Sequence, residues 1–370
     1  MNKLAIAALV LTTSGGCFNG CQKKKESEAI EPPPAMPAQP ETPTKPMTGD
    51  EIAQREIACW GFYSDAKWDE FKACFAPDAT YVDLSAQALG QSGITKGAAA
   101  ILDASKASKV GVPDAKGDVR VVLVHGHDVA ALTWISGTHT GPIEGVSGMN
   151  QKVGQLGGEL VTFDDQGRVT QETDYDDDPT TTNQLVPDPH HPVRPADHMP
   201  DVAKETVVAK NDDGEKANVA VVQSLIDAFD KHDAKAMGRA FADDLVWSEQ
   251  ENPKDWTKAE TLADAQANWK AFSDMKMTST ALWGAGSYVV LQASMEGTND
   301  AAAPAMGIAT ATKKHVTLPF FEIDQIANGK IAKAWVVANS GVVPYELGLK
   351  PMPAMPATGS AAPGSAGSAK

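Results

Sequence analysis

Apolar residues recur at helical spacing in two parts of the chain that lie far apart in the sequence. Val222, Leu225, Ile226 and Phe229 occupy positions i, i+3, i+4 and i+7, so a helix would place them on one buried face. An earlier segment carries a similar stripe, made of Ala53, Ile57 and Trp60. The pattern predicts an amphipathic helix at the start of each part.

A second short helix is predicted after each stripe, and its apolar positions correspond at one constant offset. Each member of the first set lies 166 positions before its counterpart, and the pairs are Trp68 and Ala234, Phe71 and Met237, and Phe75 and Phe241. The stretches 75–81 and 241–247 are also alike. We therefore predict two tandem copies of one small domain.

Strand-like runs follow the helices in both copies. They cover residues 119–124, 129–138 and 158–163 in the first copy, and residues 287–297, 315–326 and 330–339 in the second. Because helices come first and strands afterwards, the order indicates an α+β fold. We predict domain 1 over residues 50–186 and domain 2 over residues 216–349.

The length of the chain bounds the number of domains, and its net charge disfavours nucleic acid binding. A chain of 370 residues with 42% hydrophobic residues can form two cores of ordinary domain size. Its net charge of −16 argues against a nucleic acid partner, because phosphates would be repelled and the only basic cluster is 23–25.

The first 16 residues have the order of an export signal. Lys3 precedes an apolar run over residues 4–11 that is too short to span a bilayer, and small residues then lead to Cys17. This order resembles the signal of bacterial lipoproteins, in which Cys17 becomes the lipid-bearing N-terminus after cleavage. Cys21 is the alternative lipidation site, and simple secretion is the alternative fate.

The two ends of the mature chain are rich in residues that do not pack. A tether rich in proline, glutamate and lysine is predicted over residues 17–49, and a disordered tail of Pro, Ala, Gly and Ser over residues 350–370. Together with the export signal and Cys17, the tether indicates an exported protein of the cell envelope that is held at a membrane by its lipid.

Cys59 and Cys74 are the two remaining cysteines. Export permits a disulfide, and a turn near residues 65–67 would bring the two sulfurs face to face across a helical hairpin. The second copy has Leu225 and Ala240 at the matching positions, so the fold does not require the pair. A disulfide and two reduced core cysteines both stay open.

The segment between the copies, residues 187–215, is rich in proline and is predicted to be a solvated linker. It contains side chains that suit zinc or copper, namely Asp188, His190, His191, Asp197 and His198. A proline-rich segment fixes no geometry for them, so we expect no metal site. His125 and His127 are predicted to be exposed residues of a strand turn.

Four short motifs stand in order in the second copy: Gly307–Lys314, Phe321–Ile323, Gly329–Trp335 and Tyr345–Gly348. The first copy has matching stretches at residues 137–141, 167–169 and 183–185. In order and spacing these motifs resemble the second half of SnoaL-like proteins, which are polyketide cyclases and relatives within the nuclear transport factor 2-like superfamily.

The resemblance implies a cone of helices and curved antiparallel sheet around an apolar pocket, with no cofactor. The family's cyclases use an aspartate on the last strand as general base and acid on a carbon acid, and the matching residues are Asp177 in copy one and Asn339 in copy two. A histidine that faces the same pocket corresponds to His139, and to Asn299 in copy two. An asparagine cannot take up the proton, so the resemblance assigns any acid–base chemistry to domain 1.

Two functions are compatible with these residues. The first is binding of a small apolar molecule, with cofactor-independent cyclase-like or isomerase-like turnover by Asp177 and His139 if the protein is an enzyme. The alternative is a noncatalytic envelope protein whose domains pack as an intramolecular pseudo-dimer, or which forms a homo-oligomer. Asp177 belongs to the acidic run 174–178, and such a run at a strand end is also compatible with a solvated exit or a weak cation site.

Overall fold

The computed structural model describes residues 45–351, apart from residues 144, 145 and 190. The predicted export signal, Cys17, most of the tether and most of the C-terminal tail lie outside the described residues. In the described part, no helix has both the length and the apolar character that crossing a membrane requires.

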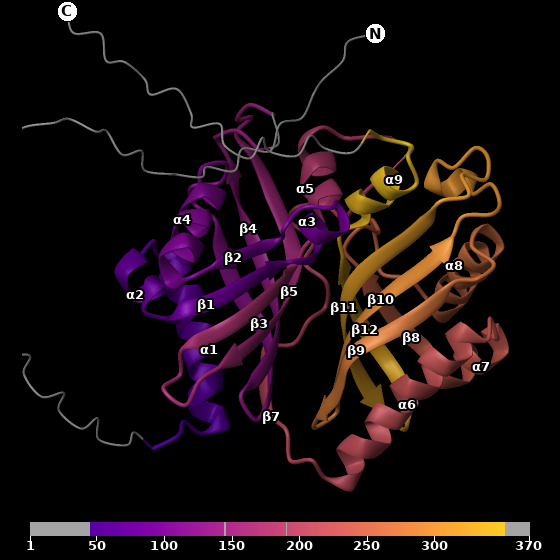
Figure 1. The fold of residues 1–370 in the computed structure, drawn as a ribbon. Helices are drawn as coiled ribbons and strands as arrows, with labels where there is room; N and C mark the ends of the chain where they lie inside the picture. Colours follow the sequence, from indigo (N-terminus) through magenta and orange to yellow (C-terminus); the bar gives the residue numbers. More distant parts are fainter. Residues whose placement is uncertain (1–44, 144–145, 190, 352–370) are drawn as a thin grey trace, which may run out of the picture.

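The first copy folds into a sheet with helices on one face (Figure 1). Its elements are α1 (Gly49–Ser64), α2 (Trp68–Lys72), β1 (Phe75–Asp83), α3 (Leu84–Ala88), β2 (Ile94–Lys96), α4 (Ala98–Ser108), β3 (Lys116–His125), β4 (Asp128–His139), β5 (Gln151–Phe163), β6 (Val169–Tyr175) and α5 (Asp178–Leu185). The strands lie in the order β2-β1-β6-β5-β4-β3, and β1 runs parallel to β6 while the other pairs are antiparallel.

The second copy repeats this plan. Its elements are α6 (Asp213–Asp230), α7 (Ala234–Ala240), β8 (Phe241–Glu249), α8 (Lys258–Ala271), β9 (Lys276–Ala285), β10 (Tyr288–Thr298), the 3-10 turn Pro304–Met306, β11 (His315–Ala327), β12 (Lys330–Ala338), the 3-10 turn Ser340–Val342 and α9 (Val343–Glu346). The strand order β8-β12-β11-β10-β9 corresponds to β1-β6-β5-β4-β3. The α+β class predicted from the sequence is confirmed.

Capping residues fix where the long helices begin. Thr48 and Glu51 form a reciprocal capping box at the start of α1, and Thr257 and Glu260 form one at the start of α8. Each box satisfies backbone N–H groups that the first helical turn leaves unpaired. Asp212 accepts a hydrogen bond from the backbone of Glu215 and caps α6 in the same way.

Each sheet is buried on both faces, which gives four layers in the order helices, sheet, sheet, helices (Figure 1). Val122 and Val124 of β3 pack toward α1 and α4, while the alternate residues Val121 and Leu123 face the sheet of domain 2. Because both faces are covered at the centre of the sheets, β3, β4 and β10 contain buried apolar residues at successive positions, namely 121–124, 129–132 and 288–291.

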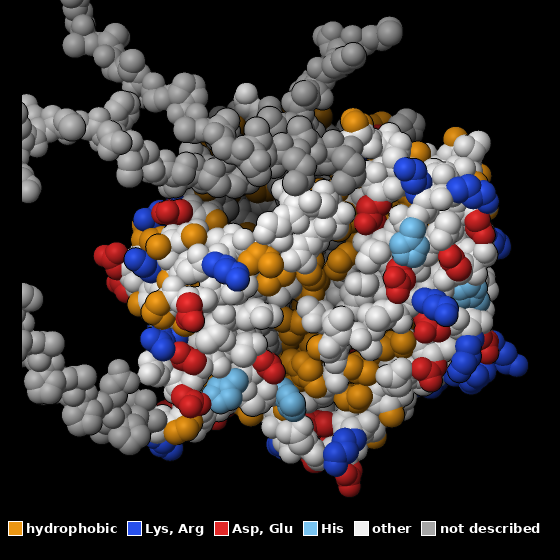
Figure 2. Space-filling view, viewed as in Figure 1, with side chains coloured by type: hydrophobic (Ala, Val, Ile, Leu, Met, Phe, Trp, Pro, Cys, Tyr) orange, Lys and Arg blue, Asp and Glu red, His pale blue; other side chains and the backbone are white. Residues whose placement is uncertain are grey.

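The two sheets meet through a third apolar core between the domains, and hydrophobic side chains are visible along this seam in Figure 2. Phe321 of β11 stacks on Tyr175 of β6 with ring centroids 5.6 Å apart. The same ring lies over Gly158 of β5, where an added Cβ would come within 2.2 Å of it. Gln292 of domain 2 donates a hydrogen bond to the Tyr175 hydroxyl at 2.6 Å.

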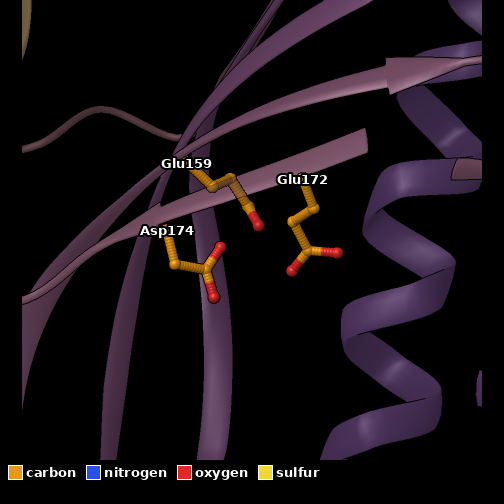
Figure 3. Close-up of side chains that lie close together, drawn as sticks. All are labelled: Glu159, Glu172 and Asp174. Atoms are coloured by element: carbon orange, nitrogen blue, oxygen red, sulfur yellow. The ribbon is translucent and has the colours of Figure 1, made fainter. Parts of the chain in front are cut away.

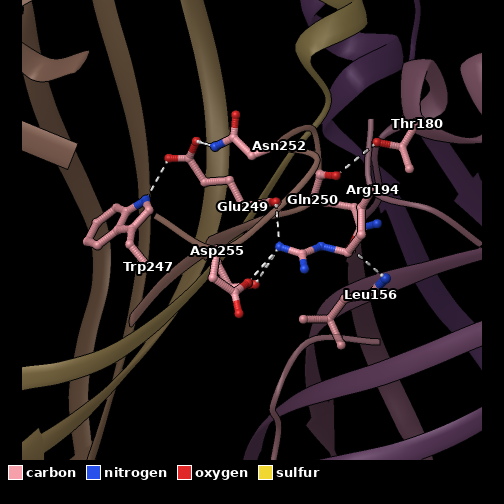
Figure 4. A network of polar contacts seen from close by, with 9 residues as sticks. Leu156, Thr180, Arg194, Trp247, Glu249, Gln250, Asn252 and Asp255 are labelled. Atoms are coloured by element: carbon pink, nitrogen blue, oxygen red, sulfur yellow. Dashed lines mark hydrogen bonds and ion pairs between the residues drawn. The ribbon is translucent and has the colours of Figure 1, made fainter. Parts of the chain in front are cut away.

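The segment between the copies is not simply a solvated linker, and that prediction was wrong in part. Glu205–Val208 forms β7, which extends the first sheet beside β3 in parallel, and Val202 is buried between the domains. Arg194 is 4% exposed, and its guanidinium donates to Asp255 at 2.7 Å (Figure 4). A four-residue strand and one buried arginine leave too little periodicity for the sequence pattern to predict them.

The loop after β8 joins domain 2 to domain 1. The Gln250 side chain accepts a hydrogen bond from the backbone N–H of Leu156 in β5 at 2.9 Å, and the Thr180 hydroxyl donates to the Gln250 carbonyl at 3.2 Å (Figure 4). These buried bonds satisfy polar groups at the domain boundary that water cannot reach.

Cys59 of α1 and Cys74, the residue before β1, form a disulfide in the core of domain 1. Leu225 and Ala240 pack at the corresponding positions of domain 2. The bond ties the first helix to the first strand within one domain.

The contact of Phe321 with Gly158 yields a prediction about stability. Gly158→Ala should lower the free energy of unfolding in urea by about 1–3 kcal/mol, since the added methyl group overlaps a fully buried ring. The matched control is Gly157→Ala. The Cβ added there would come no closer than 3.2 Å to another atom, the Cδ1 of Ile135, so this substitution should change the free energy of unfolding much less. Equal effects of the two substitutions would contradict the described packing.

Candidate functional site

Asp177 lies at the boundary between the domains, where it begins α5. Its carboxylate accepts hydrogen bonds from the backbone N–H and the hydroxyl of Thr180, at 3.0 and 2.6 Å, and from the same two groups of Ser340 in domain 2, both at 2.9 Å. Burial raises the pKa of Asp177, while these four donors act in the opposite direction. Each of its oxygens already has two partners, and the side chain is fully buried.

His139 ends β4 and is also fully buried. Neither ring nitrogen has a hydrogen-bond partner, so no hydrogen bond links His139 to Asp177. Its counterpart Asn299 bonds to the backbone of Ala271 and Ala301 and accepts from Thr312, which fastens the loop before β11. His139 pairs with Gln151 at the start of β5, whereas Tyr175, two residues before Asp177, pairs with Gly158, so the two residues predicted as a catalytic pair lie at different levels of the sheet.

A cavity of about 70 Å³ lies inside domain 1, and neither Asp177 nor His139 lines it. Its walls come from α1 and from β1, β4, β5 and β6, and the lining residues are Trp60, Tyr81, Thr133, Ile135, Gly157, Gly158, Glu159, Asp174, Tyr175 and Asp176. The cavity thus lies between the helices and the sheet, where the resemblance to the SnoaL-like fold implies a pocket.

Carboxyl groups, rather than apolar side chains alone, distinguish this cavity. Glu159, Glu172 and Asp174 point toward one another from neighbouring strands, with oxygens within 4.8 Å of one another (Figure 3). Trp60 of α1 donates its indole N–H to Glu159 at 2.7 Å. Glu56, one helical turn before Trp60, is buried beside Glu159.

Burial raises the pKa values of all four carboxyl groups. The pKa of Asp174 is raised to about 6 and that of Glu56 to about 7. Burial also raises the pKa values of Glu159 and Glu172 well above the usual range, and neighbouring carboxylates add to the shift. Protons shared among the four groups relieve their repulsion, because like charges this close cannot all ionise at neutral pH.

These oxygen donors are spaced so that a divalent cation would fit among them, since hard cations prefer carboxylate ligands. The histidines of the segment between the domains take no part in such a group within the described residues. His125 instead stacks on Trp283 of domain 2 at 5.5 Å, and His127 is exposed and lies 3.4 Å from Asp165.

Strand pairing defines the equivalent positions in domain 2. Glu159 pairs with Ala131 and Glu322 pairs with Leu291, which is the same step of the corresponding hairpins. By this register, the domain 2 residues at the positions of Gly157, Glu172 and Asp174 are Phe320, Ala334 and Val336. The fully buried Phe320 side chain therefore fills the place that Gly157 leaves open in domain 1.

Domain 2 nevertheless keeps buried acids. Glu322 and Asp324 of β11 are buried, and Oε1 of Glu322 and both carboxyl oxygens of Asp324 have no hydrogen-bond donor. Burial raises the pKa of Asp324 to about 7 and that of Glu322 well above the usual range. Glu249 accepts from the indole N–H of Trp247 and from the Asn252 amide at 2.8 and 2.7 Å (Figure 4).

The sequence contains a pattern that indicates this cluster, although its residues lie outside the family motifs. Glu172 and Asp174 are two residues apart, so a strand places both on one face, and Glu159 interrupts an apolar run. Acids on the buried face of a strand predict either a site or paired carboxyl groups. Their convergence with Glu56 depends on pairing across the chain and is not visible in any single segment.

The sequence profile of the SnoaL-like polyketide cyclase family matches residues 51–185 and 219–341. The chain therefore belongs to this family, and it contains two of its domains in tandem. No curated protein sequence matches the chain.

Solved structures give likenesses to one domain at a time. A putative hydroxylase, AclR from Streptomyces galilaeus, is 18% identical over 37% of this chain and 99% of its own, with a TM-score of 0.34. IdmH, a putative polyketide cyclase from Streptomyces antibioticus, is 18% identical over 35% of this chain and 98% of its own, with a TM-score of 0.32. A putative SnoaL-like polyketide cyclase from Jannaschia sp. CCS1 is 15% identical over 38% and 99%, with a TM-score of 0.35.

The raised pKa values predict how stability depends on pH. A carboxyl group with a raised pKa holds its proton in the folded protein at a pH where the unfolded chain has lost it, so its stabilising contribution is complete below about pH 4 and falls as the pH rises through the folded value. The free energy of unfolding should therefore decrease from about pH 5 to pH 8.

Asp324→Asn tests this dependence on one group, whose pKa is raised to about 7. The substitution should make the decrease measured by urea unfolding shallower, because the amide does not ionise. Asp213→Asn, at a fully exposed side chain, is the control and should leave the slope unchanged. A slope that Asp324→Asn does not alter would show that Asp324 titrates normally.

Proposed function

We propose that domain 1 binds a small carbonyl compound in its cavity and catalyses cofactor-independent proton transfer at the carbon beside the carbonyl group. The observation that carries the proposal is the placement of Glu159 and Asp174, two carboxyl groups with pKa values raised to different extents, on the wall of one cavity. Neighbouring acids whose environments separate their pKa values can act as base and acid at the same pH.

The two groups take complementary roles. Asp174, with a pKa of about 6 and one buried oxygen without a hydrogen-bond partner, is largely ionised at neutral pH and accepts the proton from carbon. The electron pair of the broken C–H bond moves to the carbonyl oxygen. Glu159, whose pKa burial raises well above the usual range, keeps its proton and donates it toward that oxygen, which stabilises the enolate.

The roles expected for Asp177 and His139 are not part of this proposal. The oxygens of Asp177 are occupied by four donors from both sides of the domain boundary. The same bonds support a second candidate function, a noncatalytic protein in which the two domains act as one packed unit. Absence of turnover in domain 1 would favour that candidate.

Exchange of carbon-bound hydrogen tests the proton transfer without knowledge of the natural substrate. Acetone, a small ketone with hydrogen on the carbons beside its carbonyl group, should incorporate deuterium from heavy water in the presence of the protein, as followed by proton NMR. Asp174→Asn should reduce the rate by about a hundredfold or more, because it removes the base. Glu322→Gln, at the domain 2 position equivalent to Glu159, is the control and should exchange at the wild-type rate. Exchange that is absent, or unaffected by Asp174→Asn, refutes the proposal.

We further propose that the protein is exported and anchored by a lipid on Cys17, so that domain 1 works in the cell envelope. The order of residues 1–17 supports this, and so does the disulfide in domain 1, because disulfides persist in oxidising compartments. In the native host, Cys17→Ser should release the protein from the membrane fraction. Cys21→Ser is the control and should not, and unchanged membrane retention of Cys17→Ser would exclude an anchor at this residue.

A further inference from the structure

We propose that the ligand of the domain 1 cavity carries a positive charge and belongs to the class of small primary alkylammonium compounds. This inference rests on the proposed function in taking the cavity as the ligand site, and it adds the charge and the polar group of the ligand. It derives from the charge balance of the walls, from an unpaired hydroxyl group and from the size of the space.

The walls are rich in carboxyl groups and lack cations. Glu159, Asp174 and Asp176 line the cavity, and Glu56 and Glu172 lie behind them. No lysine, arginine or histidine is among the lining residues, and none of the ion pairs within the described part of the chain reaches these five acids. Burying an ionised carboxyl group without a cation is costly. Bound protons relieve this cost for some of the groups, and a bound cation would relieve it for those that ionise.

A second observation, independent of the acids, also points to a ligand. Thr133 of β4 lines the cavity and is 2% exposed, and its hydroxyl oxygen has no hydrogen-bond partner. A buried hydroxyl group without a partner is unusual in folded proteins. A primary ammonium group has three N–H donors, so it can donate to this oxygen and to an ionised carboxyl group of the wall at the same time.

The remaining walls suit the carbon part of such a ligand. Trp60 and Tyr81 contribute aromatic rings and Ile135 an apolar side chain. Aromatic faces attract cations, and this attraction strengthens where water is excluded. The combination of rings and carboxyl groups favours an organic cation over a metal ion, which would need oxygen ligands all around it.

The size of the cavity limits the part of the ligand that it encloses. Its volume is about 70 Å³. That is roughly half of the volume of a cavity known to hold benzene, so about three or four non-hydrogen atoms fit inside. Asp176 is exposed, so a larger molecule can place its ammonium end inside and extend past this residue.

Two isosteric probes separate charge from shape. Isopropylammonium and isopropanol have the same number of non-hydrogen atoms and differ in the charged group. Measured by saturation-transfer NMR on the protein comprising both domains, isopropylammonium should bind about tenfold more tightly than isopropanol, the ratio expected from a desolvated cation–π contact together with a charge-assisted hydrogen bond.

Substitutions of the lining residues test whether isopropylammonium binds in the domain 1 cavity. Glu159→Gln, Asp174→Asn and Thr133→Val should each weaken isopropylammonium binding by about threefold to tenfold. Glu322→Gln changes the equivalent acid of domain 2 and should leave binding unchanged. Thr133→Val keeps the shape of the side chain, so it tests the site even if a carboxyl variant fails to fold.

The outcomes distinguish this inference from the proposed function. If isopropanol binds as tightly as isopropylammonium while acetone exchange persists, the charge assignment is wrong and the proton-transfer function stands. If neither probe binds and no exchange occurs, both proposals fail. Binding of Mn²⁺ that displaces isopropylammonium and is lost in Asp174→Asn would overturn the organic cation in favour of a metal site.

Discussion

The packing of one sheet against the other is the contact on which the rest of this structure depends. Helices cover one face of each sheet, so the second sheet removes the last face from water. This explains why β3, β4 and β10 carry apolar residues at successive positions, and why a polar side chain on a central strand cannot be hydrated by bulk water. Glu159 and Glu322, in the middle of such strands, lie on the helix side of their sheets, where burial raises their pKa values well above the usual range.

The two domains differ in what surrounds the buried glutamate on the central strand. Both keep a glutamate at the equivalent step of the sheet, and domain 1 leaves room beside it, because Gly157 stands where domain 2 has the fully buried Phe320. Domain 1 also places two further acids on β6, whereas domain 2 has Ala334 and Val336 there. Domain 1 therefore has a cavity with carboxyl groups on its wall. In domain 2 the Phe320 side chain occupies the equivalent place, and Glu322 and Asp324 remain as buried acids.

Periodicity and the constant offset between the copies were sufficient to predict the α+β class, the tandem organisation and the approximate position of six strands. The strands β1, β2, β6, β7, β8 and β9 were not predicted. β7 has only four residues, too few to show a pattern, and Phe75 and Phe241, which were assigned to helices, are the first residues of β1 and β8. The roles of individual acids could not be predicted from neighbouring sequence: Asp177 has the strand-end position of a catalytic base, yet its carboxylate is bound by Ser340, 163 residues away. Local pattern determines which face a side chain takes, while its partners depend on how distant strands meet.

Gly158 and Phe321 occupy equivalent positions of β5 and β11 and lie against each other across the boundary between the domains. Two copies of domain 2 joined in the same way would bring two Phe321 rings into one place, and two copies of domain 1 would leave a void there. A substitution pair of this kind makes each half the preferred neighbour of the other and a poor neighbour of itself.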